Sequence, residues 1–334
     1  IVKDVLVRFL RYVVIATTAD EESSSCPSTK GQMELARLLE KELKELGLSQ
    51  VECDSCGYVY GTLTASRGVK SPPITFCAHM DTSPSEPGKD VRPLLHKNYN
   101  GGEITFPDDP GLKITLHDSP DLESYKGDTI ITASGKTLLG ADDKAGIAEI
   151  MTALACLSKD KEAKHPELRV VFTPDEESGR GTGKIDIERL GKYGYTMDGS
   201  RAGEIEDECF DAWKTEFVFT GANVHPGFAK GQMLNAAEIA ARFISQVPEQ
   251  ETPAHTEKRE GFFHLTGFSG EENRARFAFI LRDFEEEEKR GRIAYLEQLK
   301  EAFEVRYPGL GIEMTVTHQY LNILRTLEKH RRVT

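Results

Sequence analysis

The stretch KTLLGADDKAGIAEIMTAL, residues 136–154, joins a pair of acidic residues, set between glycines, to an apolar pattern of helical period. The apolar residues Ile147, Ile150 and Leu154 fall on one face of the helix that this spacing predicts. The runs TIITAS before it and LRVVFTP after it have the composition of β-strands. Strands that alternate with helices indicate an α/β fold, in which helices cover both faces of a mostly parallel sheet.

Composition and charge exclude two classes of partner. The 334 residues carry a formal net charge of −13, so a nucleic acid or an anionic membrane would be repelled. No apolar run is long enough to cross a bilayer, and the opening residues lack the features of a signal peptide. The six cysteines are scattered, which is typical of a reducing compartment, and we expect a cytoplasmic protein. Cys53 and Cys56 lack a second pair nearby, which favours ordinary strand-edge cysteines.

The pattern of strands and helices changes after about residue 207. From DAWKTEFVFTG to GIEMTVTHQY the order is β-α-β-β-α-β, which is the ferredoxin-like pattern. We therefore predict a catalytic, metal-binding domain over residues 1–207 that continues at 321–334, with a second domain inserted over 208–320. Residues 84–126 are rich in Pro, Gly and Asp, and we expect a long excursion with a small hairpin there.

Acidic side chains and one His follow four predicted strands at the point where each strand ends. The runs ITFCA, GKTLLG, LRVVFTP and YGYTM lead to HMD, DD, DEE and D, respectively. Ligand sites form at the carboxyl ends of strands in open α/β sheets, so these side chains are expected at one edge of the sheet. The set consists of His79, Asp81, Asp142, Glu176, Glu177 and Asp198.

Each of these four groups has an ordinary structural explanation when it is taken alone. A His near an Asp is often a loop residue, an acidic pair before a helix is often a cap with a solvated neighbour, and DEES is a common turn. These explanations do not account for four groups at four strand ends. Several carboxylates in one cleft shift one another's pKa values unless cations neutralise them. A mixed set of His and carboxylates suits zinc, manganese or cobalt, so the sequence predicts a metal site.

Several motifs together resemble those of a known enzyme family. HMDTSP, KTLLGADDKAGIAEIMTAL, FTPDEESGRG, TMDGS, NVHPGFAKG and LRDF are similar to motifs of the metallopeptidase family M20, in particular of its tripeptide aminopeptidases. The resemblance implies a zinc-peptidase-like catalytic domain with two zinc ions, release of the N-terminal residue from tripeptides, and a possible homodimer formed through the inserted domain. The alternatives are another hydrolase of the family (dipeptidase, carboxypeptidase or N-acyl amino acid deacylase) or a non-catalytic binding protein on the same scaffold.

The resemblance also assigns metal ligands. His79 and Asp198 correspond to ligands of one metal ion, and Glu177 corresponds to a ligand of the other. Asp142 corresponds to the carboxylate that bridges both ions, and Asp81 to the residue that orients the His. A cis peptide bond after the bridging Asp, between Asp142 and Asp143, is implied as well.

Four further residues correspond to groups that act on the substrate. Glu176 resembles the general base, which takes a proton from the attacking water and returns it to the leaving amine. His225 resembles the residue that stabilises the developing oxyanion. Arg282 resembles the residue that holds the terminal carboxylate of the substrate, and Asn223, in the same motif as His225, is a further candidate for substrate binding.

The resemblance ends near the C-terminal end of the sequence. The family pattern has one more metal-ligating His and a Gly-Gly-Thr-Asp-type loop before it, and the sequence contains no match to either. The late histidines His318 and His330 do not fit that motif. We therefore expect a truncated chain whose second metal site lacks a ligand and which hydrolyses tripeptides poorly.

Overall fold

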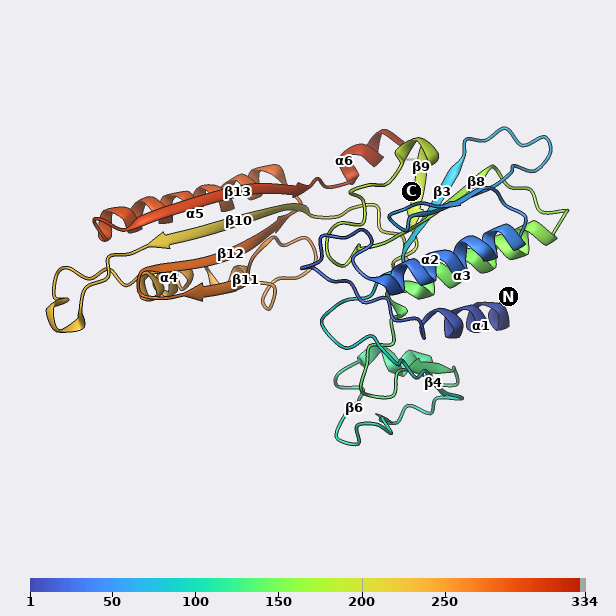
Figure 1. Ribbon diagram of the computed structural model, residues 1–334, viewed down its shortest axis with the longest axis horizontal. Coiled ribbons are helices and arrows are strands. Elements are labelled where there is room, and N and C mark those ends of the chain that lie inside the picture. Colours follow the sequence, from blue (N-terminus) through green and yellow to red (C-terminus); the bar gives the residue numbers. More distant parts are fainter. Residues whose placement is uncertain (200, 331–334) are drawn as a thin grey trace. The chain divides into compact units, whose positions relative to one another are not determined.

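The computed structural model describes residues 1–199 and 201–330. The chain divides into two compact units, Ile1–Ala202 and Gly203–Thr334 (Figure 1). The boundary lies at 202/203, where 207/208 was expected, and residues 321–330 group with the second unit although they were expected to continue the first. The rest of that expected continuation, residues 331–334, lies outside the described residues. Among the described helices, none is both long and apolar enough to cross a membrane.

A five-stranded sheet forms the centre of the first unit. Its order is β1-β2-β8-β3-β9, in which β3 pairs parallel with β8 and β9, whereas β2 pairs antiparallel with β1 and β8. The α/β class is confirmed, but the sheet is mixed where a mostly parallel sheet was expected, because β2 pairs antiparallel with both of its neighbours. Because β3, β8 and β9 run in one direction, their carboxyl ends lie at the same edge. The strands are β1 (Ser49–Cys53), β2 (Val59–Leu63), β3 (Ile74–His79), β8 (Leu168–Thr173) and β9 (Tyr193–Thr196).

Three helices pack against one face of this sheet, namely α1 (Val2–Tyr12), α2 (Lys30–Glu45) and α3 (Ala141–Lys159). Their apolar stripes form one core with the strands, in which Leu35 and Ile147 are fully buried. Burial of one such side chain stabilises the fold by roughly 2 kcal/mol. This core holds the start of α3 next to the carboxyl ends of the strands.

The opposite face of the sheet packs differently. Tyr58, Tyr60 and Val171 form a small cluster there with Ile185 and Leu190. The last two residues flank the short 3-10 helix η2 (Ile187–Arg189). Helices were expected on both faces, but within the described residues this face carries a loop with one helical turn.

Two runs that the sequence marks as strands behave differently in the structure. TIITAS forms β7 (Ile130–Thr132), which pairs with β4 (Leu94–His96) in a separate two-stranded sheet. GKTLLG is not a strand, because Gly135 and Gly140 adopt positive φ values of 107° and 77° that interrupt an extended backbone. Asp142 therefore follows a loop. The expected small hairpin is present in the excursion as β5 (Ile104–Thr105) and β6 (Lys113–Ile114), followed by the 3-10 helix η1 (Pro120–Tyr125).

The second unit has the predicted β-α-β-β-α-β order, with an antiparallel sheet β11-β12-β10-β13 (Figure 1). Phe217, Phe219, Phe243 and Phe277 pack against one another in its core. The main elements are β10 (Asp211–Thr220), α4 (Ala236–Ile244), β11 (Phe262–Gly270), β12 (Arg274–Asp283), α5 (Glu286–Arg306) and β13 (Gly311–Tyr320). Short helical turns are η3 (Pro226–Phe228), η4 (Glu249–Glu251), α6 (Leu324–Leu327) and η5 (Glu328–His330).

Candidate metal centre

The carboxyl ends of three parallel strands bring most of the predicted site together. β3 ends at His79, β8 continues into the DEE run, and β9 continues toward Asp198. His79 lies in register with Thr173, the last residue of β8, so these two strand ends are adjacent. Asp142 approaches from the first turn of α3. Elements far apart in the sequence thus converge at one edge of the sheet.

His79 lies at the centre of this cluster, and its side chain is only 3% exposed. Its Nε2 atom lies 2.8 Å from Asp142 Oδ1 and 3.9 Å from Asp198 Oδ2. Its Nδ1 atom lies 3.0 Å from the main-chain oxygen of Asp81 and 3.4 Å from Asp81 Oδ1. A proton on Nδ1, donated to Asp81, directs the Nε2 lone pair toward the acids, which is the arrangement of a metal-ligating His.

Asp81 connects this His to the two neighbouring glutamates. Its carboxylate is fully buried, and its two oxygens accept the main-chain N–H groups of Glu176 and Glu177, each at 2.9 Å. The same side chain faces His79 Nδ1. One carboxylate therefore fixes both the ring orientation of the His and the position of the turn that carries the glutamates.

The adjacent acids Asp142 and Asp143 have different environments. The peptide bond between them is cis, as the resemblance implied. The Asp142 side chain is 70% exposed and faces the His79 ring, whereas Asp143 is buried and accepts the main-chain N–H groups of His79 and Gly146 at 3.1 and 3.2 Å. A Cβ atom on Gly146 would lie 1.9 Å from the oxygen of Met197, so only glycine allows α3 to approach the end of β9. Asp143 anchors the helix, and Asp142 is free to bind a ligand.

Three acids of the cluster lie in surroundings that disfavour their charge. Burial and the nearby charge of Asp142 raise the pKa of Asp198 to about 6. Burial likewise raises the pKa of Asp143 to about 8, and it raises that of Glu177 above its usual range. Burial alone would lower the pKa of His79, but the hydrogen bond to Asp81 and the surrounding acids raise it to about 10. A cation bound among these groups would favour ionised acids and a neutral His.

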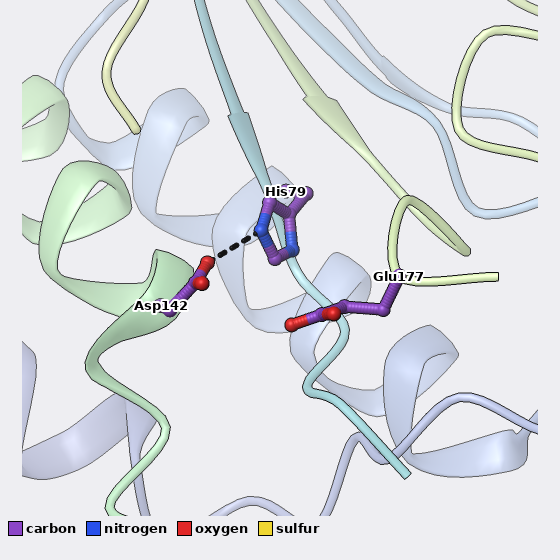
Figure 2. Close-up of side chains that lie close together, drawn as sticks. All are labelled: His79, Asp142 and Glu177. Atoms are coloured by element: carbon purple, nitrogen blue, oxygen red, sulfur yellow. Dashed lines mark hydrogen bonds and ion pairs between the residues drawn. The ribbon is translucent and has the colours of Figure 1, made fainter. Parts of the chain in front are cut away.

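Among the described residues, two groups of side chains have ligand atoms that all lie within 4.8 Å of one another: His79, Asp142 and Glu177, and His79, Asp143 and Asp198. Figure 2 shows the first group, with the Asp142 carboxylate directed at the His79 ring and Glu177 reaching the same space. The donor set of one imidazole and several carboxylates fits a divalent metal ion such as zinc. Because both oxygens of Asp143 already accept main-chain N–H groups, Asp198 is the better ligand of the second group.

The sequence assigned no role to two buried charged residues near the centre. Asp175 accepts hydrogen bonds from Ser28 N at 2.9 Å and from Gln32 Nε2 at 2.8 Å, and thereby fixes the start of the turn that carries the two glutamates. Lys144 is buried and donates to the main-chain oxygen of Ile15 at 2.8 Å. Burial lowers the pKa of Lys144 to about 8, against the opposing charge of Asp81. In the sequence, Asp175 is visible only as the first acid of DEES, and Lys144 only as the residue directly after the acidic pair.

A cavity of about 500 Å³ opens next to Glu177. Four of its lining residues are acidic, namely Asp20, Glu21, Glu22 and Glu177, and three more come from the loop after β3. A positively charged group of a small ligand would be attracted into this space. The full lining is Ala19, Asp20, Glu21, Glu22, Ser83, Pro84, Ser85 and Glu177.

The remaining candidates lie in the second unit. Asn223 and His225 are exposed in the loop between β10 and α4, and His225 Nδ1 accepts the main-chain N–H of Gly227 at 3.1 Å. Arg282, on β12, donates to the side chain of Gln319 at 3.0 Å and lies over the ring of Tyr320. Their roles remain predictions.

The chain was compared with known protein families and with known proteins. Residues 210–309 match the family model of the peptidase dimerisation domain of M20 peptidases. A peptidase T of Geobacillus kaustophilus (strain HTA426) is 44% identical over 332 residues, which cover 99% of this chain and 81% of the relative.

Solved structures show a similar fold. A tripeptidase from Staphylococcus aureus subsp. aureus Mu50 superposes with a TM-score of 0.72 at 21% identity, covering 96% of this chain and 76% of that chain. A Bacillus subtilis protein described as a dinuclear metal-binding peptidase of the M20 family has a TM-score of 0.52 at 13% identity, covering 96% of this chain and 76% of that chain.

Proposed function

This chain belongs to the peptidase T family of the M20 metallopeptidases, and from that premise we propose how its residues perform the reaction. Its activity is the metal-dependent release of the N-terminal residue from tripeptides. A peptide bond is stable in neutral water, so the enzyme must supply a nucleophile, a place for the developing negative charge and a proton for the leaving amine.

The proposed metal ligands are His79, Asp142, Glu177 and Asp198. The observation that supports them best is the position of His79 Nε2, which faces two of these carboxylates while Nδ1 faces buried Asp81. Zinc is the metal that we propose, because this donor set matches its usual ligands. Elemental analysis of the purified chain, and of its His79→Ala variant, tests the ligand set. Metal content that is unchanged in the variant would contradict the assignment.

Glu176 is the proposed general base. When bound, divalent metal ions lower the pKa of a water molecule from 15.7 to about 7 and stabilise negative charge on a carbonyl oxygen. Glu176 accepts a proton from the attacking water and then transfers it to the nitrogen of the leaving amine. Two observations support this role: Asp81 holds the main chain of Glu176, and the Glu176 carboxylate belongs to neither group of ligand atoms found among the described residues.

Substrate recognition is proposed from the resemblance for Asn223, His225 and Arg282. A guanidinium such as that of Arg282 can hold the terminal carboxylate of a short peptide through two parallel hydrogen bonds. His225 would donate to the oxyanion that develops on the scissile carbonyl. Assays with a tripeptide, a dipeptide and an N-acyl amino acid test the substrate class. Faster turnover of the dipeptide or of the acylated amino acid would contradict tripeptide specificity.

We expect Asp81→Asn to lower both metal affinity and kcat/KM by about 10- to 100-fold. The Asn side chain keeps the volume, but its NH2 group cannot accept one of the two glutamate N–H groups that the carboxylate oxygens now accept. Metal titration and steady-state kinetics on a tripeptide measure the effect. Asp186→Asn, which alters a cap of η2, serves as the control and should leave both quantities unchanged. Normal metal affinity in Asp81→Asn would contradict this role.

The acidic cavity beside Glu177 is proposed to receive the ammonium end of the substrate. Replacing Glu21 and Glu22 together with Gln should raise KM by about three- to tenfold and leave kcat nearly unchanged, because exposed charges contribute up to about 1 kcal/mol each. The difference in KM between the double variant and the wild type should become smaller at high salt. The control replaces two exposed acids elsewhere, Glu149 and Glu162, with Gln. A KM that rises equally in both double variants would reflect net charge and would contradict the cavity assignment.

Residues 210–309 are proposed to form the contact of a homodimer, because they match a peptidase dimerisation domain. Sedimentation equilibrium of the purified chain tests this proposal, and a monomer at all concentrations would overturn it.

A further inference from the structure

Two cysteines that are 30 residues apart meet in the first unit. Cys26 precedes Pro27, and Cys56 lies in the turn between β1 and β2. The Cys26 Sγ atom lies 4.0 Å from the main-chain oxygen of Cys56, and the two side chains share a hydrogen bond. Burial and this hydrogen bond raise the pKa of Cys26 to about 11, so Cys26 is a thiol at neutral pH. Both side chains are half-buried, and a small reagent can therefore reach them.

A lysine lies against this pair. Lys184 Nζ lies 3.4 Å from Cys56 Sγ and interacts with Cys26 as well. The hydrogen bond to Cys56, followed by the nearby Cys26, raises the pKa of Lys184, so its ammonium is charged at neutral pH. A positive charge at this distance stabilises the negative charge that a sulfur atom carries when it acts as a nucleophile. Of the two sulfur atoms, that of Cys56 is therefore the better placed to attack an oxidant.

The neighbour of Cys56 in the CxxC sequence does not take part. Cys53 is buried, and its Sγ atom contacts the Met33 sulfur at 3.9 Å and the main-chain oxygen of Asp54 at 3.7 Å. The two cysteines that lie together, Cys26 and Cys56, are thus brought together by the fold and are not the two cysteines of the CxxC motif.

We propose that Cys26 and Cys56 form a disulfide when the protein meets hydrogen peroxide. The Cys56 sulfur attacks one peroxide oxygen and the O–O bond breaks, which oxidises Cys56 to a sulfenic acid. The leaving hydroxide takes the proton of the Cys56 thiol and becomes water. The Cys26 sulfur then attacks the Cys56 sulfur, and the S–O bond breaks as the S–S bond forms. The departing hydroxide takes the proton of the Cys26 thiol and becomes water. Two thiols and one peroxide yield one disulfide and two waters.

The disulfide would restrain residues 23–32, the segment that supports the turn with Glu176 and Glu177. Ser28, two residues after Cys26, donates its N–H to Asp175, and Gln32 donates to the same carboxylate. Arg180, at the far end of that turn, donates to the main-chain oxygen of Ser23. A covalent bond between Cys26 and Cys56 closes a loop around these contacts and should make the first unit harder to unfold.

The test treats the purified full chain with hydrogen peroxide, blocks free thiols and maps peptides by mass spectrometry. We expect a linked peptide that contains Cys26 and Cys56, together with a thermal unfolding midpoint that rises by several degrees and returns after reduction. Cys156→Ser, a control on α3, should behave as the wild type does. Cys26→Ser and Cys56→Ser should give neither the linked peptide nor the shift. Peroxide treatment that oxidises the chain without linking these two cysteines would overturn the proposal.

The role of Lys184 has its own test. Lys184→Met should slow disulfide formation by about three- to tenfold at pH 7, whereas Lys184→Arg, which keeps the charge, should remain close to the wild-type rate. Equal rates in all three proteins would overturn the assignment of Lys184.

Discussion

Replacing Glu176 with Gln should lower kcat/KM on a tripeptide by about 10³- to 10⁴-fold. Gln has nearly the same shape, so the main-chain N–H of residue 176 can still bind Asp81. The amide cannot accept a proton from water, and the reaction loses its base in the first step and its acid in the second. Because the Glu176 carboxylate lies outside both groups of ligand atoms, the metal content should stay that of the wild type.

Three proteins should be compared in this experiment. Glu177→Gln changes a proposed ligand and should lose metal as well as activity. Glu188→Gln changes an exposed acid in η2 and should affect neither. Kinetics and elemental analysis on the same preparations separate these outcomes. If Glu176→Gln lost metal in proportion to activity, Glu176 would be a ligand and the division between the two glutamates would be wrong.

The parts of the fold that the sequence predicted are those with local signals. The second unit was predictable because alternating and helical apolar patterns follow one another in a complete β-α-β-β-α-β order. His79, Glu177 and Asp198 were predictable as a group because each lies at or just after the end of a strand, and parallel strands end at one edge. Such patterns can be recognised from a residue and its immediate neighbours in the sequence.

The parts that could not be predicted depend on contacts between distant residues. Gln32 and Asp175 are 143 residues apart, and nothing in DEES reveals that its first acid is buried against α2. GKTLLG has the composition of a strand, but none of the described strands pairs with it, and glycines with positive φ bend it into a loop. The difference between Asp142 and Asp143 likewise depends on which side chain reaches the N–H of His79. The residue type limits the interactions that a side chain can make, and the packing of distant residues decides which of these interactions forms.

Removing bound metal with a chelator should abolish tripeptide hydrolysis and lower the thermal unfolding midpoint of the first unit. Metal at about 1,000 times its dissociation constant stabilises the folded state by about 4 kcal/mol, which corresponds to roughly 10 °C for a unit of this size. Differential scanning calorimetry before and after chelation measures the shift, and zinc added back should restore it. Glu176→Gln should show the same shift, because Glu176 is not a proposed ligand.

The metal-free protein should also become less stable as the pH rises. The pKa values of Asp198 and Asp143 are raised to about 6 and about 8, above the value of about 3.9 in an unfolded chain. At pH values between the unfolded and the folded pKa values, the folded state binds more protons than the unfolded state. The free energy of unfolding therefore falls as the pH rises. His79, with a pKa raised to about 10, acts in the same direction at higher pH. Bound metal neutralises the charge of the ionised acids. The rise in the thermal unfolding midpoint on adding zinc should therefore be larger at pH 8 than at pH 5. An equal gain at both pH values would show that these carboxylates do not surround the metal.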